Sequence, residues 1–298
     1  MMRTEAASFI YMRDGRKLAY KEYGASGGIP VMLFHGTPGS KIWYAEEDDI
    51  ALSLGIRLIA TDRPGFGTSD NKPGRSLLHW ADDIVQLADQ LGIGQFAVLG
   101  ASGGGVYAAA CAYAIPDRLR NVTMVASATP FVNGKPSKAM IKENRTVFWL
   151  GRHAPWLLKP ALQSQRKMML NKPDKFLDLM KKGNSHLSDW DKQYVQTDEQ
   201  LNEMFIHLHE AYRVSVDGML YETRLLTQPW GFDVEDIAIP VHLWHGEADR
   251  MAPYEDAKEL ADRMRHAHFH SFPGAGHFLT SDESIWTSIL QTVRADFS

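Results

Sequence analysis

Three residues far apart in the sequence have side chains that together support nucleophilic chemistry: Ser102, Asp249 and His277. A serine hydroxyl is a weak nucleophile until a base takes its proton, and imidazole titrates close to neutral pH. A carboxylate can hold the imidazole in the useful tautomer and stabilise its protonated form. If the chain brings these residues together, we expect Ser102 to attack an electrophilic carbon, His277 to act as the base and Asp249 to orient His277.

The segment around Ser102 indicates a strand, a tight turn and a helix. The apolar run 96–99 meets Gly100-Ala101-Ser102-Gly103-Gly104, and an alanine-rich segment without a helix breaker continues to Pro116. In a G-x-S-x-G turn, β-carbons at the flanking glycines would collide with the neighbouring strand or helix. The hydroxyl then lies beside the first N–H groups of the helix, where negative charge is favoured. A glycine-rich turn of this kind can also bind a phosphate, so the turn alone leaves both interpretations open.

A second loop has the composition of a site for a developing oxyanion. The apolar run 30–34 is typical of a strand buried on both faces, and it ends at His35-Gly36-Thr37-Pro38-Gly39-Ser40. We expect the backbone N–H groups of Thr37 and Gly103 to bind the oxyanion together. The alternative is an ordinary Gly-Pro connector without a chemical role.

The acid and the base each follow a short apolar segment near the end of the chain. The segment 240–244 leads into the loop of Asp249, and 269–272 leads into the loop of His277. Other candidates fit less well, because Glu247 precedes the tip of its turn and Asp256 is expected to be helical already. We expect His35 and His245 to have structural roles. Three other histidines, His266, His268 and His270, alternate along a predicted strand and could share one face as in a metal site. No nearby cysteine or carboxylate set completes such a site, so a metal site is disfavoured.

The rest of the pattern predicts the elements that must position these residues. Two short segments within 9–23 flank an Asp-Gly turn and indicate an antiparallel pair. A helix is expected over 43–53, a strand over 57–61, a helix with Ser76 as its N-cap, and a strand over 119–128. Such alternation of strands and helices predicts an α/β fold, with a parallel sheet covered by helices on both faces.

Three motifs, in order and spacing, resemble the α/β-hydrolase fold superfamily: 35–39 (HGTPG), 62–70 (DRPGFGTSD) and 100–104 (GASGG). The resemblance covers the first half and the last quarter of the chain. It implies a mostly parallel eight-stranded sheet, a core of residues 1–128 and 230–298, and a helical cap or lid of residues 129–229. It also implies catalysis by Ser102, Asp249 and His277, in the family's order of serine, acid and histidine, without a cofactor. Because a serine occupies the position of the nucleophile, the dehalogenase and epoxide hydrolase branches, which use aspartate there, are disfavoured.

The segment 129–229 has an uneven charge. Residues 135–182 contain twelve Lys and Arg against three Asp and Glu, whereas 183–229 contains three against eight. This asymmetry either favours anionic substrates or reflects solvated surfaces and attraction between the two halves. Its large apolar residues either line an acyl pocket or form the core of the cap, and they are Phe148, Trp149, Trp156, Met168, Met169 and Met180.

Composition excludes several classes of protein. With 298 residues, 44% hydrophobic residues and a net charge of −4, the chain can bury a full core and lacks the basic surplus of a nucleic-acid-binding protein. The longest apolar run, 106–115, is much shorter than the ~20 residues that cross a bilayer. The N-terminal segment lacks the apolar core of a signal peptide, so we expect a cytoplasmic protein. The single cysteine, Cys111, forms no intrachain disulfide and is expected to be a buried packing residue.

These observations predict a cofactor-free serine hydrolase that acts on a small-molecule carboxylic ester. Two alternatives keep the same residues. The 35–39 loop is similar to the H-G-G-P-G loop of proline iminopeptidases, and a substrate amine would then need a carboxylate such as Glu199, Glu203 or Glu210. Ligand-sensing members of this fold also resemble hydrolases but turn over little substrate. Lyase or cofactor-free oxygenase chemistry on the same scaffold stays open as well.

Overall fold

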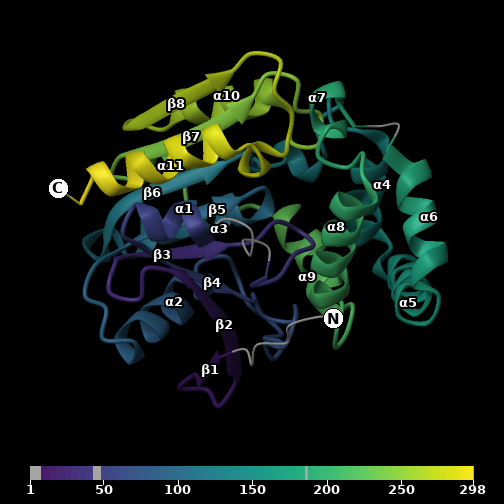
Figure 1. The fold of residues 1–298 in the computed structure, drawn as a ribbon, viewed down its shortest axis with the longest axis horizontal. Helices are drawn as coiled ribbons and strands as arrows, with labels where there is room; N and C mark the ends of the chain where they lie inside the picture. Colours follow the sequence, from purple (N-terminus) through teal and green to yellow (C-terminus); the bar gives the residue numbers. More distant parts are fainter. Residues whose placement is uncertain (1–7, 43–47, 185–186, 298) are drawn as a thin grey trace.

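An eight-stranded sheet forms the centre of the computed structural model, which describes residues 8–42, 48–184 and 187–297 (Figure 1). The strands lie in the order β1-β2-β4-β3-β5-β6-β7-β8, and only β1 and β2 run antiparallel to their neighbours. This arrangement confirms the predicted fold class. The strands are β1 (Ser8–Tyr11), β2 (Lys17–Gly24), β3 (Ile29–Phe34), β4 (Ile56–Thr61), β5 (Phe96–Ala101), β6 (Leu119–Val125), β7 (Val241–Gly246) and β8 (Ala267–Phe272).

The two central strands are apolar along their length because both faces of the sheet are covered. All six residues of β5 are buried, as are the last four of β3. In the parallel register Phe34 lies opposite Gly100, so both strands end at the same edge. This register places the loop after Phe34 beside the turn that carries Ser102.

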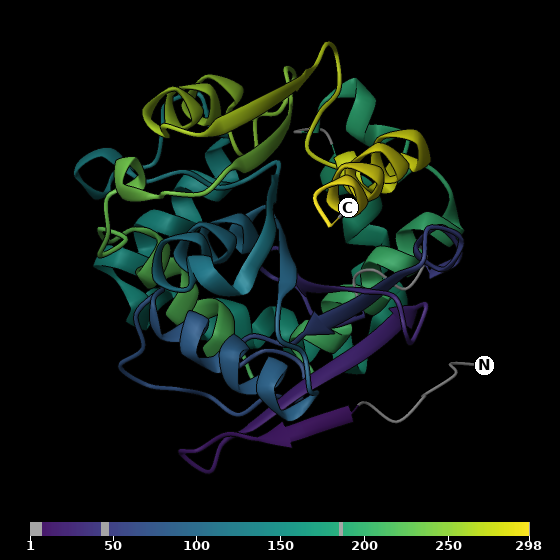
Figure 2. The same ribbon diagram turned by 90° about the vertical axis from the view of Figure 1, so that its left-hand side faces the viewer.

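Helices pack on the two faces of the sheet as two layers (Figure 2). One face packs against α2 (His79–Gln90), α3 (Gly103–Ala114) and α10 (Tyr254–Arg263), and the other against α1 (Asp48–Ser53) and α11 (Glu283–Ala295). Each layer has its own apolar core, with Trp80 and Tyr107 in the first and Trp286 in the second. The sheet is therefore a rigid platform from which the loops at its edge project.

A helical insertion separates β6 from β7 and lies at one end of the sheet, on the right in Figure 1. Its apolar core includes Phe176 and Phe205, together with Phe66 from a loop of the sheet domain. The insertion therefore packs directly on the loop after β4. Its helices are α4 (Lys142–His153), α5 (Pro155–Asn171), α6 (Pro173–Gly183), α7 (Asp189–Lys192), α8 (Asp198–Ala211) and α9 (Asp217–Leu226).

Some local predictions were wrong. Ser76 is not an N-cap, because α2 begins at His79 with Leu78 at its N-cap, and the Ser76 backbone N–H instead donates to the His79 ring. The helix predicted over 43–53 is present as α1 from Asp48, and residues 43–47 lie outside the described residues. Within the described ranges, none of the helices has the length and apolarity needed to cross a membrane.

Candidate active site

Ser102 occupies the sharp turn between β5 and α3. Its φ of +52° is unusual for a residue with a side chain, and its backbone N–H donates to the Val125 carbonyl at 2.9 Å. A β-carbon on Gly100 would collide with the Gly104 carbonyl, and one on Gly104 would collide with the Phe34 carbonyl. The steric reason predicted for these two glycines is therefore confirmed. The turn holds Ser102 in a conformation that only a closely packed neighbourhood sustains.

The structure brings Asp249 and His277 together from the loops after β7 and β8. Asp249 Oδ2 is 2.7 Å from His277 Nδ1, and Asp249 Oδ1 accepts the backbone N–H groups of Met251 and Ala252 at 2.8 and 2.9 Å. Although burial alone would lower the pKa of His277, the charge and hydrogen bond of Asp249 raise it. The pKa of Asp249 is lowered despite its burial, because His277 and His245 stabilise the carboxylate. This carboxylate is therefore ionised and holds the ring of His277 in one orientation.

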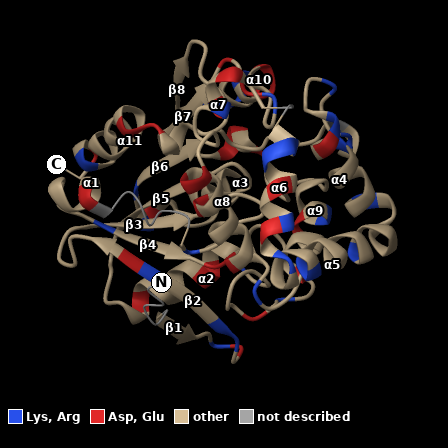
Figure 3. Ribbon diagram, turned by 45° about the vertical axis from the view of Figure 1, so that its right-hand side comes forward, with Lys and Arg blue, Asp and Glu red and all other residues tan. Residues whose placement is uncertain are grey.

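Ser102 and His277 line one cavity of about 220 Å³ at the edge of the sheet, beneath the helical insertion. Among the described lining residues there is no Lys, Arg, Asp or Glu, although Figure 3 shows Lys and Arg along α4, α5 and α6. Neither the basic half of the insertion nor any of the three suggested glutamates contributes to this lining. The other lining residues are Gly36, Thr37, Pro38, Ala101, Val125, Ala126, Asn184, Leu187, Met204, Leu208, Met251, Phe278 and Thr280.

The six large apolar residues named from the sequence do not line this cavity, so their suggested role in an acyl pocket was wrong. Met169 is buried in the core of the insertion, against which Met168 and Met180 pack. The suggestion of a core role was also wrong for Trp149 and Trp156, which are 53% and 71% exposed. The cavity is instead lined from the insertion by Met204 and Leu208 of α8.

Thr37 and Gly103, the expected oxyanion donors, lie next to each other. A β-carbon built on Gly103 would be 3.5 Å from the backbone nitrogen of Thr37. One built on Gly36 would be 3.9 Å from Ser102 Oγ. The Gly36–Thr37 peptide group therefore lies beside Ser102 and beside Gly103, the first residue of α3.

The residues that hold this loop were missed by sequence reasoning. Arg63 and Glu222 are both fully buried, and their side chains pair at 2.6 Å from Arg63 Nε to Glu222 Oε1. Although burial alone would raise the pKa of Glu222, the charge and hydrogen bonds of Arg63 lower it to about 2. Arg63 belongs to the 62–70 motif, which was a usable signal, whereas no sequence pattern marks Glu222 in α9. A second ion pair joins the buried Lys41 to the partly buried Glu210 of α8 at 2.8 Å, so Glu210 is already engaged.

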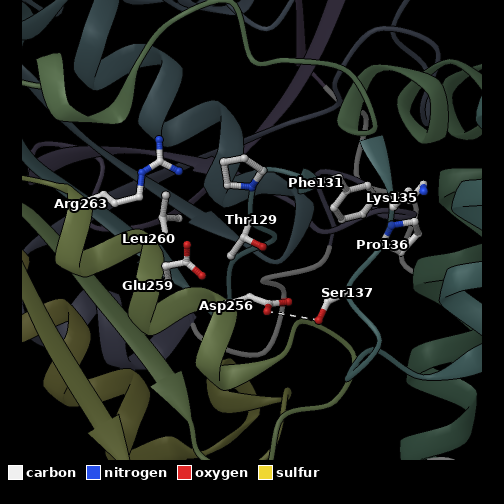
Figure 4. Close-up of a pocket in the computed structure, with 10 residues that line it drawn as sticks. Thr129, Phe131, Lys135, Pro136, Ser137, Asp256, Glu259, Leu260 and Arg263 are labelled. Carbon is white, nitrogen blue, oxygen red and sulfur yellow. Dashed lines mark hydrogen bonds between the residues drawn. The ribbon is translucent and has the colours of Figure 1, made fainter. Parts of the chain in front are cut away.

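The rival acids lie elsewhere. Glu247 accepts the Ser271 hydroxyl at 2.7 Å at an exposed position, and Asp256 accepts the Ser137 hydroxyl at 3.2 Å. Asp256 lines a separate cleft of about 230 Å³, drawn in Figure 4, whose charged side chains also include Lys135 and Arg263. Neither Ser102 nor His277 lines that cleft. It is therefore not the site of the predicted chemistry.

The other histidines and the cysteine have structural surroundings. His268 and His270 both stack on His242 of the neighbouring strand β7. Within the described ranges, no three or more His, Cys, Asp and Glu residues are arranged to hold a metal ion. His35 is buried and accepts the backbone N–H of Arg63, and Cys111 is a fully buried free thiol.

Comparisons with known proteins agree with this architecture. Residues 29–284 match the alpha/beta hydrolase fold family, and the chain belongs to this family. It is 26% identical over 273 residues to a non-heme chloroperoxidase of Streptomyces lividans, covering 90% of this chain and 92% of that protein. It is 22% identical over 293 residues to a bifunctional esterase/perhydrolase of Acinetobacter calcoaceticus, covering 96% and 99%. The solved esterase of Exiguobacterium antarcticum has a TM-score of 0.72 at 20% identity and covers 97% and 99%.

Proposed function

We propose that the chain is a cofactor-independent serine hydrolase that cleaves a small-molecule carboxylic ester through an acyl-enzyme on Ser102. The main support is that Ser102 lines the same apolar cavity as His277, whose ring is held by the buried carboxylate of Asp249. In this proposal residues 1–128 and 230–298 form the catalytic core, and residues 129–229 form the cap. The same residues are expected to act without a metal or organic cofactor.

The proposed mechanism assigns a role to each group. Ser102 Oγ attacks the ester carbonyl while His277 Nε2 takes its proton, and Asp249 stabilises the resulting imidazolium. The N–H groups of Thr37 and Gly103 stabilise the oxyanion of the tetrahedral intermediate. When the intermediate collapses, the C–O bond to the alcohol breaks and His277 returns the proton to the leaving oxygen. A water activated by His277 then hydrolyses the acyl-enzyme and releases the acid.

The lining of the cavity supports a neutral, apolar substrate. A substrate carboxylate would require a cation and a free amine would require a carboxylate, because unpaired charges are costly to bury. No Lys, Arg, Asp or Glu is present among the described lining residues, while Leu208 and Met204 offer apolar contact. The bifunctional esterase/perhydrolase relative supports ester cleavage as the reaction. We therefore favour esters with short or medium apolar acyl groups over prolyl peptides and over anionic substrates.

A fluorophosphonate probe tests the nucleophile directly. We expect mass spectrometry to locate one adduct on Ser102, and we expect Ser102→Ala to lose both the adduct and the hydrolysis of p-nitrophenyl butyrate. Ser127→Ala is the matched control, because the Ser127 hydroxyl is bonded to the Ala128 carbonyl and does not line the cavity. An adduct on another residue would contradict the assignment of Ser102.

The same assay separates the alternatives. Cleavage of a prolyl-naphthylamide without cleavage of p-nitrophenyl esters would replace the esterase proposal with an aminopeptidase. A probe adduct on Ser102, together with ligands that raise the melting temperature and ester turnover near the background rate, would instead support a ligand-sensing role.

A further inference from the structure

The strongest link between the helical insertion and the proposed catalytic machinery is the side chain of Glu222. It extends from the middle of α9 into the sheet domain and is fully buried. Its Oε2 accepts the Thr37 hydroxyl at 2.6 Å and Arg63 Nη2 at 2.9 Å. Its Oε1 accepts Arg63 Nε at 2.6 Å and the Tyr107 hydroxyl at 3.0 Å. One carboxylate of the insertion therefore binds the loop after β3, the loop after β4 and α3.

Arg63 connects Glu222 to the backbone of residues 35–37, in the loop that is expected to bind the oxyanion. Its Nη2 donates to the Gly36 carbonyl at 3.0 Å and lies 3.0 Å from the Thr37 hydroxyl oxygen, and its Nη1 donates to the His35 carbonyl. A buried guanidinium keeps a single orientation when its planar set of donors is matched by fixed acceptors. Glu222 binds two of the three nitrogens of Arg63, so the remaining donors are directed at the carbonyls of residues 35 and 36.

The planarity of the peptide group converts this contact into a constraint on the proposed oxyanion donor. The Gly36 carbonyl and the Thr37 N–H belong to the same trans peptide, in which they point in opposite directions. When Arg63 binds the carbonyl from one side, the N–H must point to the other side. A β-carbon on Gly36 would lie 3.9 Å from Ser102 Oγ, so this peptide lies beside the serine.

We propose that Glu222 is a positioning residue: through Arg63 and the Thr37 hydroxyl, it holds the Gly36–Thr37 peptide so that its N–H faces the carbonyl oxygen of the substrate. This inference rests on the proposed serine hydrolase function. It makes the insertion part of the oxyanion site as well as a cover over the cavity. An oxyanion donor acts mainly in the transition state, so its misplacement lowers kcat more than it changes KM.

The first test replaces the carboxylate by an amide. Glu222→Gln places an NH₂ group against the donors of Arg63, Thr37 or Tyr107, so we expect the peptide to lose its fixed orientation. Because loss of one oxyanion donor costs about 10²- to 10³-fold in kcat, we expect partial misplacement to cost about 10- to 100-fold, with KM for p-nitrophenyl butyrate within about threefold of wild type. The rate of inactivation by the fluorophosphonate should fall in parallel.

The matched control is Glu210→Gln. Glu210 also extends from the insertion to a buried cation of the sheet domain, Lys41, and Lys41 keeps its second partner Asp62 at 2.7 Å. Within the described part of the chain, the side chain of Glu210 bonds to Lys41 and Arg213, and not to residues 35–37. We expect kcat of Glu210→Gln to stay within about threefold of wild type even if its melting temperature falls. An equal loss of kcat in both variants would show that Glu222 only anchors the insertion, and would overturn the proposal.

A second pair of variants decides the question if Glu222→Gln does not fold. Thr37→Ser keeps the hydroxyl that Glu222 binds, whereas Thr37→Val removes it but keeps the backbone N–H and a similar volume. We expect kcat of Thr37→Val to be about 5- to 30-fold lower than kcat of Thr37→Ser, because only the serine keeps the hydroxyl that Glu222 binds. Equal kcat in these two variants would contradict positioning through the hydroxyl.

The failure of the proposed function and the failure of this inference give different results. If wild type neither reacts with the fluorophosphonate probe nor cleaves esters, the proposed function itself has failed. If wild type is active and the variants are unaffected, only the role of Glu222 is refuted.

Discussion

Replacing Asp249 by asparagine gives the sharpest prediction for the proposed mechanism. Asp249 Oδ1 accepts two backbone N–H groups, while Oδ2 lies 2.7 Å from His277 Nδ1. An asparagine keeps its oxygen toward the two N–H groups, so its NH₂ group must face His277. The imidazole then accepts at Nδ1 and carries its proton on Nε2. In that tautomer it cannot take the proton of Ser102.

The magnitude follows from the interactions that are lost. Loss of a charge-assisted hydrogen bond costs about 1.5 to 3 kcal/mol, and return to the active tautomer breaks the new amide contact for about 1 to 2 kcal/mol more. The sum of about 2.5 to 5 kcal/mol corresponds to a fall in kcat of about 70- to 5,000-fold. The pH profile provides an independent test, because the direction of its shift can be predicted. The Asp249 carboxylate raises the pKa of His277, so its removal should move the acid limb of kcat/KM to lower pH.

The assay is hydrolysis of p-nitrophenyl butyrate across pH, with the melting temperature measured for each variant. Asp191→Asn is a suitable control for kcat, because Asp191 is also a buried carboxylate beside this loop and accepts the Phe278 N–H at 2.9 Å. Its charge also raises the pKa of His277, so the acid limb should move to lower pH in this variant as well. Its amide oxygen can keep that hydrogen bond, so we expect kcat within about fivefold of wild type. A folded Asp249→Asn variant that keeps more than a tenth of the wild-type kcat would refute the reasoning.

Three further predictions concern the cavity, the thiol and the turn. Leu208→Phe adds volume to the cavity lining, so kcat/KM for p-nitrophenyl octanoate should fall more than about tenfold while the value for the acetate changes less than about threefold. Burial raises the pKa of Cys111, so Ellman's reagent should label native protein only at the rate of unfolding, and rapid labelling would contradict its burial. Gly104→Ala should lower the free energy of unfolding by about 1 to 3 kcal/mol in urea titrations, because its β-carbon would collide with the Phe34 carbonyl. Gly94→Ala, where the space is open, should change it by less than about 0.5 kcal/mol.

The sheet and the place of its loops were predictable because their signals are local. A buried parallel strand is a short apolar run, and a sharp turn requires glycines such as Gly100 and Gly104. Parallel strands present their carboxyl ends at one edge, so residues that follow successive strands must meet there. This reasoning was enough to place Asp249 beside His277 without any knowledge of the contacts between them. The exact ends of helices and strands were harder to predict, as Ser76 shows, because caps depend on the geometry of a single turn.

The insertion was less predictable because its helices pack according to tertiary contacts. Apolar residues in a short helix have the same pattern whether they face a core, a cavity or solvent, so Trp156 and Met169 could not be distinguished. No sequence pattern indicated that Glu222 is buried, because a glutamate in a helix is ordinarily exposed to solvent. Its burial is compensated by the ion pair with Arg63 and by the hydroxyl groups of Thr37 and Tyr107. In the proposed mechanism the loop after β3 binds an oxyanion and needs a fixed peptide, and the groups that hold this loop come from segments about 160 residues apart in the sequence. A variant insertion that lacked this carboxylate would therefore have to supply another partner for Arg63 or lose the geometry of the loop.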